Sequence, residues 1–163
     1  MILSLDPSTA ATGWALWAGG KLVTSGVFNP PRSLLKAEKA NADDLVFELF
    51  MKRFNYIQQA LETLILSHAI SKVIIEDQFL GRSVRSMKVL VEFRTAIESI
   101  CIQNGVSIVR VMPSVWQSFV FKYRVSAKQT KQESVSHVAR LYAHDCTHDE
   151  SDAILIGHWY LNK

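Results

Sequence analysis

The stretch Ile2-Leu3-Ser4-Leu5-Asp6-Pro7-Ser8 decides the fold, because it places a carboxylate at the end of a short apolar run. The run has the length and composition of a buried β-strand, and Asp6-Pro7-Ser8 has the chemistry of a turn. A carboxylate at the end of a buried strand costs solvation free energy unless something compensates it. Asp6 is therefore either an ordinary turn residue or part of a polar site.

Three further acids stand in comparable places. A second apolar run, residues 73–75, ends at Glu76, and Asp149 and Asp152 open the last apolar segment. Because Asp149 and Asp152 are three residues apart, they share one face of a helix. Two strand ends and a helix start can converge around hard divalent cations, which prefer oxygen ligands. A site of this kind with two metal ions can hydrolyse phosphodiesters by in-line displacement.

Each acid also has a structural explanation. Glu76 can be a solvated strand end. Thr147 and Glu150 have the spacing of a capping box, and acids in a first helical turn complement the helix dipole. Glu150 is the better candidate for plain capping, since it points away from the face that Asp149 and Asp152 share. Of the nearby histidines, His144 reads as an exposed loop residue, whereas His148 directly precedes Asp149 and stays open.

Along the chain, hydrophobic periodicity predicts strands followed by alternating helices and strands. Helices are expected over residues 42–65, 83–103, 114–121 and 126–142 and from residue 149, and strands over residues 2–5, 13–17, 21–28, 73–76 and 106–111. We find no internal repeat and no linker. The order predicts an α/β fold, with a mixed five-stranded sheet flanked by helices in a single domain over residues 1–163.

Composition limits the class of protein. The chain has 163 residues, of which 48% are hydrophobic and 20% charged, and this predicts a globular protein. No apolar stretch is long enough to cross a bilayer. The two cysteines, Cys101 and Cys146, do not have the spacing of a zinc site, so we expect a reducing, cytoplasmic setting. The net charge of +3 is compatible with a polyanionic partner.

Four motifs in this order resemble the RuvC family of Holliday-junction resolvases, within the RNase H-like superfamily. The likeness runs through nearly the whole chain. The first motif alone is weak, because actin-like ATPases also begin with an Asp-turn-Gly pattern, but the four acids in order are more specific. The matching segments are residues 2–8, Thr12-Gly13-Trp14, Ile74-Ile75-Glu76-Asp77-Gln78-Phe79 and Asp149-Glu150-Ser151-Asp152-Ala153.

The resemblance implies an RNase H-like fold and a magnesium-dependent endonuclease that resolves four-way DNA junctions. It implies paired symmetric nicks leaving a 5′-phosphate and a 3′-hydroxyl, made by a homodimer. Two Mg²⁺ ions, for which Mn²⁺ substitutes, are expected in each active site, with Asp6 bridging them. Phe79 matches an aromatic that wedges against bases at the junction centre. The compact length resembles that of a phage-type member. The metal ligands and catalytic residues are expected to be Asp6, Glu76, Asp149 and Asp152.

The sequence also departs from the family pattern. Pro7-Ser8 follows the first Asp where the family usually has Gly, and Trp116 stands where bacterial members carry a helpful lysine. A second family lysine falls near Lys131 or Gln132, with Lys128 close by.

Basic residues gather in two regions, which we expect to contact DNA phosphates without specifying sequence. Arg82, Arg85 and Lys88 are spaced by three, so they form a stripe on one helix face beside Phe79. Such a stripe is more often a solvated helix face, but its place beside the acids favours DNA. The second region surrounds Tyr123 and contains Lys122, Arg124, Lys128 and Lys131.

Three rival functions remain at this point. The first is a nuclease for branched DNA in general, or for RNA–DNA hybrids. The second is a non-cleaving junction-binding protein, which has no need for all four acids. The third is an actin-like ATPase, whose fold usually needs two RNase H-like halves, whereas this chain has room for one.

Overall fold

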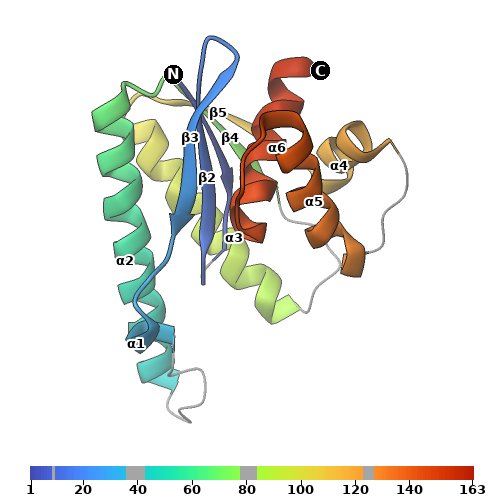
Figure 1. The fold of residues 1–163 in the computed structure, drawn as a ribbon. Helices are drawn as coiled ribbons and strands as arrows, with labels where there is room; N and C mark the ends of the chain where they lie inside the picture. Colours follow the sequence, from blue (N-terminus) through green and yellow to red (C-terminus); the bar gives the residue numbers. More distant parts are fainter. Residues whose placement is uncertain (9, 36–42, 78–83, 123–126) are drawn as a thin grey trace.

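The computed structural model describes residues 1–8, 10–35, 43–77, 84–122 and 127–163. These residues build a five-stranded sheet in the order β3-β2-β1-β4-β5 (Figure 1). The first three strands form an antiparallel meander, and β4 and β5 run parallel to β1. The sheet is therefore mixed, as predicted. The strands are β1 (Ile2–Asp6), β2 (Thr12–Ala18), β3 (Lys21–Phe28), β4 (Lys72–Glu76) and β5 (Ser107–Val111).

Helices cover both faces of the sheet (Figure 1). On one face α2 and α3 contribute Ile57, Leu61 and Phe93 to an apolar core with β1 and β4. On the other face α4, α5 and α6 contribute a second core that includes Val138 and Ile154. None of the described helices is long and apolar enough to span a membrane. The helices are α1 (Arg32–Leu35), α2 (Asp43–His68), α3 (Val84–Gln103), α4 (Pro113–Phe121), α5 (Ala127–Tyr142) and α6 (His148–Asn162).

The alternation of side chains along β1 and β4 decides which face receives the two strand-end acids. Leu5 and Ile75 lie in the core beneath α2 and α3. Ile74 lies in the core beneath α4, α5 and α6. One residue beyond Leu5 and Ile75, the side chains of Asp6 and Glu76 therefore project toward the face that α4, α5 and α6 cover.

The element ends agree closely with the sequence. Pro113 occupies the first turn of α4, as its fixed φ favours, and Gly105 follows α3 with a φ of 70°, a conformation that suits Gly. The last helix begins at His148, one residue before the expected start. The short helix α1 was not predicted; four residues are too few to show a helical period.

Two glycines let α6 lie directly on the sheet. A Cβ atom at Gly157 of α6 would stand 2.2 Å from Nε1 of Trp17 on β2. A Cβ atom at Gly13 of β2 would stand only 1.8 Å from the backbone oxygen of Asp149. Real Cβ atoms essentially never come so close. Glycine is therefore required at both positions, because the neighbouring atoms leave no room for a side chain. This close contact holds the start of α6 against β2.

Candidate active site

The parallel register of β1 and β4 places two of the predicted acids side by side. Leu5 pairs with Ile75, so the last residue of each strand, Asp6 and Glu76, lies at the same end of the sheet. Both acids are half-buried. Since they also face the same side, their carboxylates meet the same layer of helices.

The N-terminal part of α6 brings the other two acids to this end of the sheet. Gly13, whose Cα is in contact range of the Asp149 backbone, is itself the β2 partner of Asp6. Asp149 is thereby placed beside Asp6. Asp152 lies one turn further along the same helix and is half-buried, with its Oδ1 atom shielded from solvent. Asp149 and Asp152 therefore lie near each other at the start of α6, as their spacing predicted.

The four acids, Asp6, Glu76, Asp149 and Asp152, thus border one end of the sheet. Within the described part of the chain, however, no three Asp, Glu, His or Cys side chains are gathered closely enough to hold a metal ion as they stand. The backbone positions therefore bring the four acids to the same end of the sheet, but their carboxylates are not arranged around a common metal position.

The chemistry of this donor set fits a hard divalent cation. Every donor is a carboxylate oxygen. Mg²⁺ and Mn²⁺ prefer such oxygen ligands, whereas softer metals prefer nitrogen or sulfur. Converging carboxylates also repel one another, which raises the free energy of the ionised cluster. A divalent cation removes that repulsion, so the residues fit the group that the sequence led us to expect.

The capping box at the start of α6 is present as predicted. The Thr147 hydroxyl accepts from the Glu150 amide at 3.4 Å, and Oε2 of Glu150 accepts from the Thr147 amide at 3.3 Å. Glu150 also accepts a bond of 2.7 Å from the hydroxyl of Ser25 on β3. The side chain that sequence reasoning assigned to plain capping therefore also fastens α6 to the edge strand.

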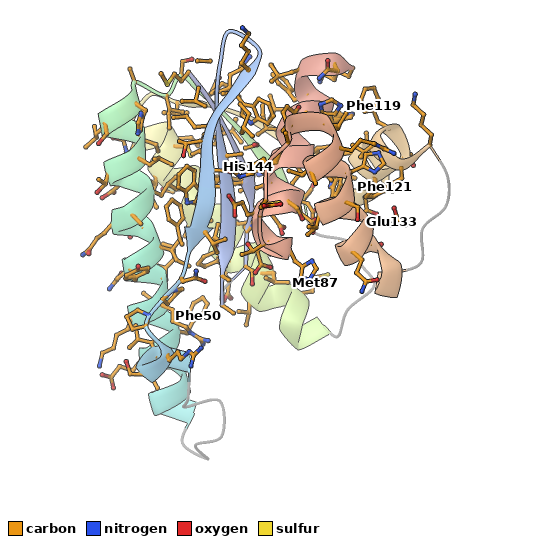
Figure 2. The ribbon with its side chains drawn as sticks, in the orientation of Figure 1. Phe50, Met87, Phe119, Phe121, Glu133 and His144 are labelled. Atoms are coloured by element: carbon orange, nitrogen blue, oxygen red, sulfur yellow. The ribbon has the colours of Figure 1, made fainter. Side chains whose placement is uncertain are left out.

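His144 lies in the loop between α5 and α6, as expected, but it is half-buried rather than fully exposed. Its Nε2 atom lies 3.1 Å from the Ser25 hydroxyl and 3.3 Å from Oε1 of Glu150, and the side chain is only 37% exposed. His144 thus joins the hydrogen-bond network of Ser25 and Glu150, beside the sheet (Figure 2). No local sequence signal joins residues 25, 144 and 150. His148 is exposed.

A buried tryptophan contacts the site. Trp116 of α4 is fully buried, and its indole Nε1 donates a hydrogen bond of 2.7 Å to Oε2 of Glu76. The sequence marked Trp116 only as a departure from the family pattern. Nothing in its spacing from Glu76 indicated the contact, because the two residues meet only when α4 packs on the sheet.

A charged network follows Glu76 on the other side. Asp77, the next residue, forms an ion pair with Arg94 of α3. Glu98, one turn along α3, lies 3.5 Å from Arg94 and accepts two bonds from Arg110 of β5, at 2.7 and 2.6 Å. Arg94 and Glu98 are buried, so the network links α3 to the ends of β4 and β5. Its one sequence signal was the i, i+4 spacing of Arg94 and Glu98.

The structure describes fewer of the predicted DNA-contacting residues than of the acids. Lys122 is exposed at the end of α4. Arg85 and Lys88 fall within α3, and Lys128 and Lys131 within α5, but the structure describes none of these four side chains. Phe79, Arg82 and Arg124 lie outside the described residues.

Solved structures show what this fold is similar to. RuvC of T. thermophilus in complex with a Holliday junction substrate superposes with a TM-score of 0.70 at 15% identity, covering 97% of this chain and 90% of that one. The Fowlpox virus resolvase in complex with Holliday junction DNA gives 0.62 at 11% identity, covering 99% and 98%. The yeast mitochondrial Holliday junction resolvase Ydc2 gives 0.52 at 12% identity, covering 98% and 77%.

The mixed five-stranded sheet and its helices are those of the RNase H-like resolvases. The sequence model of the crossover junction endodeoxyribonuclease RuvC matches residues 2–158. The chain belongs to that family and is a crossover junction endodeoxyribonuclease, a class of divalent-metal-dependent nuclease. No curated protein sequence matches it at a significant level.

Proposed function

We propose that this protein resolves four-way DNA junctions by two-metal-ion hydrolysis of phosphodiester bonds. Residues 1–163 act as a single nuclease domain, and Asp6, Glu76, Asp149 and Asp152 are its catalytic metal ligands. Two Mg²⁺ ions bind at each site, and Mn²⁺ substitutes for them. The products carry a 5′-phosphate and a 3′-hydroxyl.

The observation that carries the proposal is the meeting of elements from both ends of the chain. The register of β1 and β4 sets Asp6 beside Glu76, and the close approach at Gly13 sets Asp149 beside Asp6. A fold needs no such gathering of acids for stability, since like charges brought together destabilise it. The cost is understandable if these side chains bind cations.

Each acid then has a task that its position supports. Asp6 lies between Glu76 and the start of α6 and would contribute oxygens to the bound ions. Glu76 would supply a further carboxylate from β4, and Asp149 and Asp152 would supply two from one helix face. When bound, the metal ions activate water for attack on phosphorus and stabilise the leaving oxygen.

Junction DNA and a second copy of the chain complete the proposal. The T. thermophilus and Fowlpox virus structures contain Holliday junctions, which supports a branched substrate here. A four-way junction has approximate two-fold symmetry, and two symmetric nicks need two sites. A C2 dimer supplies them through one repeated interface.

A substrate panel tests the proposal. Four-way, three-way, flap and RNA–DNA hybrid substrates are incubated with the protein and either Mg²⁺ or Mn²⁺. We expect paired nicks at symmetric positions in the four-way junction, and ligation of the products by DNA ligase, which needs a 5′-phosphate and a 3′-hydroxyl. Equal cleavage of every branched substrate, or preferential cleavage of the hybrid, would overturn the junction assignment.

Replacing Arg82, Arg85 and Lys88 together by Gln is expected to weaken junction binding at every sequence and to flatten its salt dependence. Each lost phosphate contact lowers the slope of log affinity against log salt by roughly one unit. The measurement is junction affinity over a salt series. A matched control replaces Lys21, Lys52 and Lys163 by Gln, which changes the net charge equally but should leave the slope intact. An unchanged slope in the first variant means that the DNA path runs elsewhere, past Lys122, Arg124, Lys128 and Lys131.

Phe79→Ala is expected to reduce junction cleavage with little change in thermal stability. An aromatic that stacks on unpaired bases contributes roughly 1–3 kcal/mol per base, whereas truncating a core Phe costs about 3–5 kcal/mol of folding free energy. Thermal unfolding of the variant distinguishes these roles. Phe93→Ala is the matched control, since Phe93 is 1% exposed in the core and should lose stability. A comparable loss in Phe79→Ala would place Phe79 in the core.

A further inference from the structure

The indole N–H of Trp116 is aimed at one of the four acids. Trp116 is fully buried in α4, and Nε1 donates to Oε2 of Glu76 at 2.7 Å. A bond from a neutral N–H to a carboxylate is charge-assisted, and such bonds are short and strong. The ring itself cannot easily turn away, because it packs in the core beside Phe121 with ring centroids 6.2 Å apart.

A second tryptophan shows what an ordinary buried indole does in this fold. Trp17 of β2 is 1% exposed and donates from Nε1 to the hydroxyl of Ser4 at 2.9 Å. Buried tryptophans usually find such a neutral partner. Trp116 has a carboxylate instead, at the strand end where the other acids gather. A neutral acceptor elsewhere would satisfy the Trp116 N–H equally well. Its bond to a carboxylate of the candidate site therefore also affects Glu76.

The hydrogen bond from Trp116 orients the carboxylate of Glu76. A glutamate side chain has three rotatable bonds, and a fixed donor on one oxygen restricts both the direction of the chain and the plane of its carboxylate. A carboxylate has about four lone-pair sites, so one bond to Oε2 leaves capacity for a cation. Because the indole is neutral, it orients the carboxylate without supplying a positive charge that would compete with the ion.

We propose that Trp116 is a positioning residue that holds the Glu76 carboxylate ready to bind metal. The inference rests on the proposed role of Glu76 as a metal ligand. Partners that orient a ligand from outside the coordination sphere commonly change metal affinity by about 10–100-fold. Trp116 acts through Glu76 and touches neither DNA nor the scissile phosphate in this scheme.

The test compares Trp116→Phe with Trp17→Phe, since each loses one buried indole N–H. Mn²⁺ binding to the DNA-free protein is measured by calorimetry, and cleavage is measured over a range of Mg²⁺ concentrations. In Trp116→Phe we expect Mn²⁺ affinity to fall by about 10–100-fold and half-maximal cleavage to need correspondingly more Mg²⁺, with cleavage recovering at high Mg²⁺. Trp17→Phe should bind Mn²⁺ as the parent does. Parental Mn²⁺ affinity in Trp116→Phe would overturn the inference, as would an equal loss in Trp17→Phe.

Two further variants keep the test decisive. If Trp116→Phe does not fold, benzothienylalanine introduced at position 116 replaces the N–H by sulfur in an almost identical ring, and the same expectations apply to it. In a Glu76→Ala background, removing the indole donor should cause no additional loss of Mn²⁺ affinity, because its target is gone. An additional loss contradicts action through Glu76. Parental Mn²⁺ affinity in Glu76→Ala alone would instead refute the proposed metal-ligand role on which the inference rests.

Discussion

Asp6→Asn and Glu76→Gln are each expected to slow cleavage of a four-way junction by more than about 1000-fold. The substitutions keep the shape of the side chain but remove the charge that, in the proposed role, binds the ions. Metal ions contribute several kcal/mol of transition-state stabilisation, at about 1.4 kcal/mol per tenfold. Junction affinity should hardly change, because the proposed role of these acids is to bind metal rather than the phosphate backbone. Single-turnover cleavage and binding in Ca²⁺ separate the two quantities. Asp149→Asn and Asp152→Asn should behave in the same way.

The stability of these variants provides a further check. If the four acids crowd one another, removing one charge relieves repulsion, so the thermal midpoint without metal should stay constant or rise. Asp145→Asn is the matched control: Asp145 is exposed in the segment before α6, and its loss should affect neither rate nor midpoint. Near-parental cleavage by the Asp6 or Glu76 variant would refute the assignment of these acids as metal ligands.

Gly13→Ala is expected to damage both the fold and the site, although Ala adds only one methyl group. That group would stand 1.8 Å from the backbone oxygen of Asp149, and a backbone atom cannot swing aside as a side chain can. Overpacking typically costs 1–3 kcal/mol, and the strain falls on the first turn of α6. We expect a lower thermal midpoint and a loss of cleavage of at least about 100-fold, since small misplacements of catalytic groups have such effects.

Gly157→Ala is the matched control for that effect. It also overpacks α6, with a Cβ atom 2.2 Å from Nε1 of Trp17, but about two turns along the helix from Asp149. The two variants should lose comparable stability, while cleavage per folded molecule falls much further in Gly13→Ala. Equal cleavage by both folded variants would show that the approach at Gly13 does not position Asp149.

Hydrophobic periodicity was sufficient to predict the sheet and most helices. The apolar runs that end at Asp6 and Glu76 are β1 and β4, and the spacing of Ile57, Leu61 and Ile65 marks the face of α2 that enters the core. These signals are local, with periods of two or three to four residues. The strand order β3-β2-β1-β4-β5 is not encoded in this way and was not predicted; the resemblance implied only an RNase H-like fold.

The sequence indicated where the four acids lie in the fold but not what surrounds them. Each acid lies at or near the end of a helix or strand, which a local sequence pattern can reveal. The bonds from Trp116 to Glu76 and from Ser25 to Glu150 join residues 40 and 125 positions apart. Such contacts form only when the helices pack on the sheet, and the local pattern of residues in a sequence does not reveal them. The contacts of His144 with Ser25 and Glu150 were missed for the same reason.

The position of α6 has a consequence for the synthesis of this protein. Asp149 and Asp152 are translated long after Asp6, and α6 must then dock across β1 and β2. Pairing of such distant segments is slow compared with local helix formation. A nascent or prematurely terminated chain that lacks α6 therefore has only half of the proposed acid cluster. Such a chain is expected to lack the cleavage activity that we propose for the folded protein.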